Sequence, residues 1–328
     1  MLALLTVAIS ATLVILFRRV VPTQPGSPRH TLTLGAYRGD TCSLVWIANE
    51  RGYFTRHGLD LVIREHEAGK LAVDALVAGD VDVATAAEFV VVSNGFNHPD
   101  LRVVGTIARA ETMEVIARKD HGIGGIADLR GKRIGVTRKS TAEFFLGSFL
   151  LFNGLVYTDV ELVDLTPSQI VEAMDRGTID ASLTWDPNIY EIKRRLGNNA
   201  VHWPGQSGQD FYFVLVTRNQ WAEGNGEALQ RFLRAVIQAQ DDVERSPDQA
   251  QRMIAERFRY DAAYVRYIWP RHQFTVALPQ ALLIAMEDEA RRMIENDLTD
   301  AGAVPNYLNY LSFDSLQIVR PEAISVIR

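Results

Sequence analysis

The 328-residue chain contains a single cysteine, Cys42. One thiol excludes an intramolecular disulfide, and it also excludes zinc and iron–sulfur sites built from cysteine clusters. The seven histidines are scattered, with no pair four residues apart that could hold a metal on one helix face. The sequence therefore predicts no metal site and no cofactor.

Dense runs of basic residues are also lacking, and the net charge is -6. Without a stripe of positive charge to follow phosphates, we expect no nucleic-acid partner. The first 29 residues hold three arginines and no acid, so the remaining chain carries 31 basic and 40 acidic residues. This acidic body disfavours binding to anionic lipid surfaces.

The sequence also lacks the common motifs of catalytic sites. There is no Walker sequence, and no nucleophile elbow or dinucleotide fingerprint stands at a strand-to-helix turn. We therefore expect no catalytic residues and no enzyme.

What the N-terminus does have is an uncharged, mostly apolar run at residues 2–17, followed by two arginines and a linker rich in proline, glycine and serine. Sixteen helical residues span roughly 24 Å, short of the ~30 Å hydrocarbon core. We interpret residues 1–29 as a signal peptide or membrane anchor with a linker, which implies an extracytoplasmic body and membrane contact through residues 2–17. The arginines follow the run, so the positive-inside rule taken literally favours a cytoplasmic body, and this alternative stays open.

Short apolar strands alternate with helical segments along the rest of the chain, which predicts an α/β fold of mainly parallel sheets flanked by helices. The predicted strands are residues 31–36, 59–64, 81–84 and 102–107, then 133–136, 160–164 and 180–184. Two further apolar segments, 113–117 and 211–217, connect the two groups as hinge strands. We therefore expect two lobes with a cleft between them: lobe I from residues 30–112 and 213–328, and lobe II from residues 113–212.

Three stretches carry a family resemblance: IANERGYFTRHGLDL at residues 47–61, ALVAGDVDVATAAEF and DLRVVGTIA within 75–108, and IADLRGKRIGV to DRGTIDASLTWDPNI within 126–189. Together they resemble the nitrate/sulfonate/taurine-type solute-binding proteins, a family that includes binders of thiamine-pyrimidine precursors. The resemblance implies the type II periplasmic binding protein fold, a small-molecule ligand, and an ABC permease with its ATPase as partners. We expect a monomer. A sensing module for a membrane signalling partner and a cytosolic enzyme of the same fold remain alternatives.

The resemblance places the loop that starts the helix after strand 133–136 in the cleft. Arg138, Ser140 and Thr141 lie there, and a helix N-terminus offers free N–H groups and a positive dipole end to an anion. The alternative is a capping box, in which Ser140 and Glu143 satisfy each other's backbone amides.

The Trp185-Asp186-Pro187 element follows strand 180–184 and, by the same resemblance, faces the ligand. Trp185 could form an aromatic wall, and Asp186 could anchor an amine. Alternatively, Asp186 is an N-cap with Pro187 at the first helical position.

The remaining candidates follow other strands or flank the hinge. They are Arg38, Asp40 and Thr41 after the first strand, Glu88 and Phe89 after strand 81–84, and Arg109, Asp210 and Tyr212 beside the hinge strands. The alternative for the first group is a solvated turn, and for Glu88 it is an acid in the first turn of its helix. For the residues beside the hinge, the alternatives are salt bridges between the lobes or a place on the surface. Because acids outnumber bases among the candidates, the set favours an amine-bearing or neutral heterocyclic ligand over nitrate.

Overall fold

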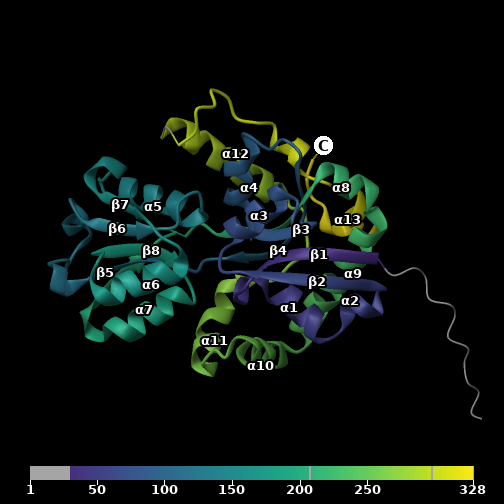
Figure 1. Cartoon of the computed structure of the whole chain (residues 1–328), viewed down its shortest axis with the longest axis horizontal. Coiled ribbons are helices and arrows are strands. Elements are labelled where there is room, and N and C mark those ends of the chain that lie inside the picture. Colours follow the sequence, from purple (N-terminus) through teal and green to yellow (C-terminus); the bar gives the residue numbers. More distant parts are fainter. Residues whose placement is uncertain (1–29, 207, 297, 328) are drawn as a thin grey trace, which may run out of the picture.

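The computed structural model describes residues 30–206, 208–296 and 298–327 (Figure 1). The leader or anchor predicted for residues 1–29, with its membrane contact through residues 2–17, lies outside this part of the chain. Among the helices that the structure describes, none has the length and apolar character needed to cross a bilayer.

The first sheet has six strands in the order β11-β4-β10-β3-β1-β2. Their bounds are β1 His30–Tyr37, β2 Leu59–His66, β3 Val83–Ala87, β4 Leu101–Ala110, β10 Phe211–Arg218 and β11 His272–Gln273. β1 pairs in parallel with β2 and β3, whereas β10 lies antiparallel between β3 and β4. β1 to β4 therefore run in one direction and β10 and β11 run against them, so the sheet is mixed where the sequence predicts a mainly parallel one.

The second sheet has five strands in the order β7-β6-β8-β5-β9. Their bounds are β5 Met113–Arg118, β6 Arg133–Val136, β7 Glu161–Asp164, β8 Ala181–Trp185 and β9 Ala200–Pro204. β6 pairs in parallel with β7 and β8, and β5 is the antiparallel strand between β8 and β9. The sequence pattern did not predict β9, an edge strand without a buried residue.

Helices cover both sheets, as the alternation predicts (Figure 1). Those beside the first sheet are α1 Ser43–Glu50, α2 Tyr53–Arg56, α3 Gly69–Ala78, α4 Glu88–Gly95, α8 Asn219–Gly224, α9 Gly226–Arg245, α10 Pro247–Phe258, α11 Ala262–Ile268, α12 Gln280–Glu295 and α13 Asp314–Val319. Those beside the second are α5 Thr141–Phe152, α6 Pro167–Arg176 and α7 Asn188–Leu196. Residues 43–56 form two helices, α1 and α2, because Gly52 adopts a left-handed conformation at φ 67° between them.

Both segments expected as hinge strands belong to a sheet: β5 to the second and β10 to the first. The chain crosses between the sheets at residues 111–112, between β4 and β5, and returns between β9 and β10. Gln206, 2% exposed, joins the two crossings. Its Oε1 accepts the amides of Thr112 (2.7 Å) and Met113 (2.8 Å), and its Nε2 donates to the carbonyls of Ala110 (3.1 Å) and Gln209 (2.7 Å). One buried amide therefore holds the crossings together.

The carboxyl ends of four strands meet between the two sheets. β1 leads into the 3₁₀ helix η1 (Asp40–Cys42), β3 into α4, β6 into α5 and β8 into α7. In open α/β sheets, ligands bind outside the carboxyl ends of the strands. The topology therefore places strand-to-helix loops from both sheets at one site.

Candidate functional site

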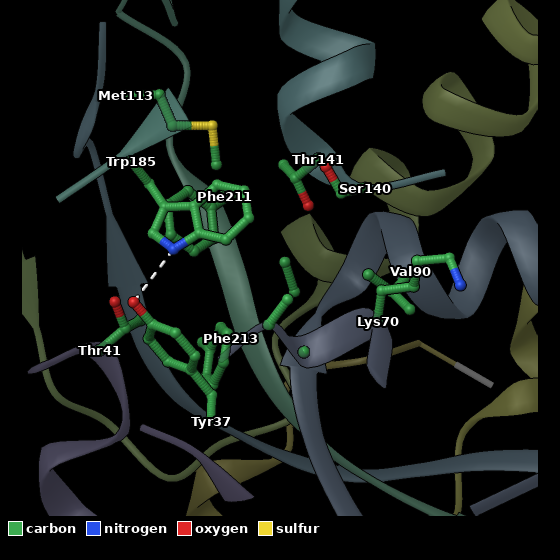
Figure 2. A pocket seen from close by; sticks show the side chains of 13 residues that line it. Tyr37, Thr41, Lys70, Val90, Met113, Ser140, Thr141, Trp185, Phe211 and Phe213 are labelled. Carbon is green, nitrogen blue, oxygen red and sulfur yellow. Dashed lines mark hydrogen bonds between the residues drawn. The ribbon is translucent and has the colours of Figure 1, made fainter. Parts of the chain in front are cut away.

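A cavity lies where these loops converge (Figure 2). It is lined by Tyr37, Thr41, Ala68, Gly69, Lys70, Ala87, Val90, Met113, Ser140, Thr141, Trp185, Phe211 and Phe213. Its empty volume is about 410 Å³, the opening to solvent included, which is within the range of small-molecule sites. Residues from both sheets contribute to the lining.

Aromatic rings form much of the cavity wall. The rings of Tyr37 and Phe213 lie 5.6 Å apart between centroids, and Phe211 packs beside Phe213 at 6.5 Å. Trp185, at the end of β8, donates from Nε1 to the Tyr37 hydroxyl at 3.0 Å, the dashed line of Figure 2. Because β1 and β8 belong to different sheets, this hydrogen bond spans the cleft.

Two helix N-termini open on the cavity, one from each sheet. Ala68, Gly69 and Lys70 begin α3, where the N-cap residue Ala68 has no side chain that could cap the first amides. Gly69 is required by packing, because a Cβ there would lie 2.7 Å from the Ala86 Cα. Ser140 and Thr141 begin α5. The first amides of a helix lack partners within it and favour anions, so this arrangement can bind a small anionic group.

The capping box considered for α5 has a different form in the structure. The Ser140 hydroxyl accepts the Ala142 amide at 3.2 Å and donates to the Thr137 carbonyl at 2.6 Å. Glu143 instead accepts the Lys139 amide at 2.6 Å and pairs with Arg138 at 2.8 Å. The alternative of a reciprocal capping box between Ser140 and Glu143 is therefore not what the structure shows, and Thr141 lies on the cavity wall.

Charged side chains are scarce in the lining. Lys70 is the lining residue with a charged group, and its Nζ is paired with Asp74 one turn along α3. No Asp or Glu lines the cavity among the described residues. A bound anion would thus be held by backbone and hydroxyl donors within apolar walls.

Four of the thirteen candidate ligand-binding residues line this cavity: Thr41, Ser140, Thr141 and Trp185. The charged, exposed candidates form ion pairs outside it. Arg38 pairs with Glu65 at 3.2 Å, and Arg109 pairs with Asp210 at 3.1 Å. The pair of Arg109 with Asp210 is the kind of salt bridge given as the alternative for residues beside the hinge, and Arg38 and Arg138 are also paired with acids outside the lining.

Four further candidates are close to the cavity but do not line it. Phe89 is buried and packs on Phe144, with ring centroids 5.1 Å apart. Glu88, 1% exposed, accepts the amide of the half-buried Tyr212 at 2.8 Å, and burial raises the pKa of Glu88 to about 8. Asp40 accepts the Tyr264 hydroxyl at 2.7 Å. These side chains lie next to the lining residues, on the side away from the cavity.

Asp186 is also buried outside the lining, with 2% of its surface exposed. Its Oδ1 accepts the Tyr190 amide at 3.2 Å, and its Oδ2 has no hydrogen-bond partner among the described residues. Burial first, and then the negative charge of Asp40, raise the pKa of Asp186 to about 8. The carboxyl is therefore mostly protonated at neutral pH, and its role as an amine anchor stays a prediction that the cavity lining does not favour.

The sequence reasoning missed most of the wall. Tyr37, Phe211 and Phe213 lie within strands, and strand alternation alone does not show which face meets a ligand. The start of α3 could have been predicted as part of the site. It follows strand β2 and begins a helix, like the strand-to-helix loops that hold the predicted site residues. Cys42 is fully buried, and burial raises the pKa of its thiol to about 12, so it is no thiolate nucleophile.

Comparison with known proteins adds to this geometry. The model of the family described as NMT1/THI5 like matches residues 42–250. A protein of Brucella abortus (strain 2308), named as a binding protein without a stated ligand, is 30% identical over 230 residues, which are 67% of this chain and 69% of that protein. The taurine-binding periplasmic protein of Escherichia coli (strain K12) is 28% identical over 187 residues, 56% of this chain and 58% of that protein.

Among solved structures, the alkanesulfonate-binding protein SsuA from Xanthomonas axonopodis pv. citri, bound to MOPS, has a TM-score of 0.75 at 20% identity. The match covers 88% of this chain and all of that chain. It confirms the periplasmic binding protein fold predicted from the sequence.

Proposed function

Because the chain belongs to the NMT1/THI5-like family, we propose that it is a solute-binding protein for a small organic anion of the sulfonate class. The observation that carries this proposal is the meeting of two helix N-termini, from α3 and α5, on one cavity with aromatic walls. Relatives named for taurine and for aliphatic sulfonates support the same ligand class. The count of acids that favoured an amine-bearing ligand no longer bears on the ligand, because those acids do not line the cavity.

The proposed mechanism is closure of two lobes on the ligand, with lobe I built from residues 30–112 and 213–328 and lobe II from 113–212. Contacts join the two sides of the cleft. They include the hydrogen bond from Trp185 to Tyr37 at 3.0 Å and the ion pair of Arg271 with Glu114 at 3.5 Å. Two ring pairs also bridge the sides, Tyr190 with Tyr264 at 4.9 Å and Phe89 with Phe144 at 5.1 Å between centroids. A ligand that touches both lobes gains contacts only when they close, and this differential affinity drives closure. The contacts across the cleft support the proposal that the lobes can close on each other.

Delivery to an ABC permease with its ATPase, from an extracytoplasmic position, is part of the proposal and rests on the family. A sensing module would use the same cavity and pass the closed form to a signalling partner instead. Reconstitution with the permease distinguishes the two, because transport requires ATP hydrolysis stimulated by the loaded protein. A ligand-bound protein that leaves the ATPase rate unchanged would favour sensing.

The ligand class is tested by thermal shift of the purified protein with alkanesulfonates, nitrate, polyamines and pyrimidines. A cognate ligand at a hundredfold excess over its Kd stabilises the protein by about 2.7 kcal/mol. We expect short-chain sulfonates to raise the midpoint and polyamines to leave it unchanged.

Two tryptophan variants localise the binding. Trp185→Ala removes a cavity wall and should weaken sulfonate binding about tenfold or more. Trp221→Ala, in α8 and outside the lining, is the control and should leave affinity unchanged. Sulfonates that fail to bind the wild type, or that bind both variants equally well, contradict the proposal.

A further inference from the structure

Thr41 contributes a hydroxyl to the cavity on a side away from the two helix N-termini. In Figure 2, Thr41 and the Tyr37 hydroxyl lie on one side of the cavity, and Ser140 and Thr141 lie on the other. Thr41 is 4% exposed, so its hydrogen bonds are made within the protein or to a bound ligand. The direction of its O–H bond therefore decides what this side of the cavity offers.

His272 fixes that direction. Its Nδ1 lies 3.1 Å from the carbonyl oxygen of Ile268, and a carbonyl only accepts, so Nδ1 carries the proton. Its Nε2 lies 3.3 Å from the Thr41 Oγ1. His272 is buried, and in the tautomer that carries its proton on Nδ1 the other ring nitrogen, Nε2, is an acceptor. Thr41 then donates its hydroxyl proton to Nε2.

Packing holds the imidazole in this orientation. Its ring is stacked on Phe274, with centroids 5.3 Å apart and planes 3° from parallel. With its proton directed at His272, Thr41 can present only oxygen lone pairs to the cavity.

The Tyr37 hydroxyl also directs its proton at a group of the protein. It accepts from Trp185 Nε1 at 3.0 Å and can donate to the Asp186 carbonyl at 3.4 Å. Both hydroxyls on this side thus offer acceptor capacity, whereas the helix N-termini of α3 and α5 offer donors. The cavity therefore has hydrogen-bond acceptors at one end and hydrogen-bond donors at the other.

We propose that His272 is a positioning residue that turns the Thr41 hydroxyl into an acceptor, so that the cavity selects a sulfonate whose opposite end carries a hydroxyl or ammonium donor. The inference rests on the proposed function, since it assumes that the anionic end lies at the helix N-termini. An apolar end at this position would leave the lone pairs of the Thr41 oxygen facing apolar atoms with no donor, which costs binding free energy. The aromatic walls add attraction for an ammonium group over a hydroxyl.

The test compares three sulfonates of nearly equal size by calorimetry on the full-length protein: 2-aminoethanesulfonate, 2-hydroxyethanesulfonate and propane-1-sulfonate. In the wild type, the two ligands with a donor should bind about tenfold more tightly than propane-1-sulfonate. A preference for the amino over the hydroxy compound would assign the donor as ammonium, and the reverse order would assign it as hydroxyl. Either order supports the acceptor side of the cavity.

Variants then assign the effect to His272 acting through Thr41. Thr41→Val removes the hydroxyl and should reduce the preference to about onefold, whereas the matched control Thr41→Ser keeps it. His272→Asn keeps an amide near the position of Nδ1 but gives Thr41 no acceptor, so the preference should fall there too. In the Thr41→Val background, His272→Asn should change the preference no further.

Two results would overturn the inference, and they differ from failure of the proposed function. If all three sulfonates bind with equal affinity to the wild type, the acceptor side does not act on the ligand. If His272→Asn binds propane-1-sulfonate normally and keeps the full preference, His272 does not position Thr41. Absence of binding by every sulfonate would instead contradict the proposed function itself.

Discussion

Replacing Asp186 by asparagine probes the most unusual buried group beside the cavity. The asparagine has nearly the same shape, its Oδ1 can still accept the Tyr190 amide, and its NH₂ replaces the unpartnered Oδ2. The substitution therefore removes the titration of the carboxyl with little change in packing. Its effect on the free energy of unfolding should depend on pH.

The sign and size follow from the two pKa values. The carboxyl of Asp186 has a pKa raised to about 8 in the folded protein, by burial and then by the charge of Asp40, against about 3.9 in the unfolded chain. Its stabilising contribution is fully present below pH 4 and is lost as the pH rises toward 8, because the folded state holds a proton that the unfolded state releases. Each pH unit in this window costs about 1.4 kcal/mol, so between pH 5 and pH 7 the wild type should lose about 2.7 kcal/mol relative to Asp186→Asn.

Urea unfolding of both proteins at pH 5, 6, 7 and 8 measures this difference. Glu88 has a raised pKa in the same range, but it is present in both proteins and cancels in the comparison. Asp80→Asn, an exposed acid between α3 and β3, is the control and should follow the wild type at every pH. A stability difference between Asp186→Asn and the wild type that does not change with pH would refute the reasoning.

Three further predictions concern the crossings, the helix start and the thiol. Gln206→Ala should lower the free energy of unfolding by about 3 kcal/mol in urea titrations, because buried amides at the crossings lose their acceptor, and a loss below about 1 kcal/mol would contradict this role. Gly69→Ala should lower both the thermal midpoint and the sulfonate affinity, because a Cβ there collides with Ala86, while Gly302→Ala, where a Cβ meets open space, should change neither. Cys42 should resist a thiol reagent at pH 8 in the native protein and react once it is denatured, and rapid native labelling would show that the thiol is accessible.

The order of strands and helices could be predicted because each element is short, apolar and bounded by turn residues. The α3 helix, for example, ends at Gly79, whose φ of 83° is the left-handed conformation expected of a helix-terminating glycine. The strand β9 could not be predicted, because its residues are partly exposed and carry no alternation. Edge strands of this kind are specified by their neighbour, here β5, more than by their own sequence.

The candidate site was predicted in part for the same reason. Loops at the carboxyl ends of strands can be located from the sequence, and this led to Thr41, Ser140 and Trp185 in the cavity lining. Which charged residues neutralise one another depends on contacts across the fold, as in the pair of Arg109 with Asp210. The contribution of His272 depends on a hydrogen bond to a residue 231 positions away, which no local pattern encodes.

A crystal structure of the protein with 2-hydroxyethanesulfonate would show directly whether this cavity binds the solute. We expect the sulfonate oxygens at the amides that begin α3 and α5, near Lys70 and Thr141, and the hydroxyl at the Thr41 oxygen. A ligand in the reverse orientation would contradict the acceptor role of Thr41. A ligand bound outside the cavity between the two sheets would contradict the central claim that this cavity is the solute-binding site.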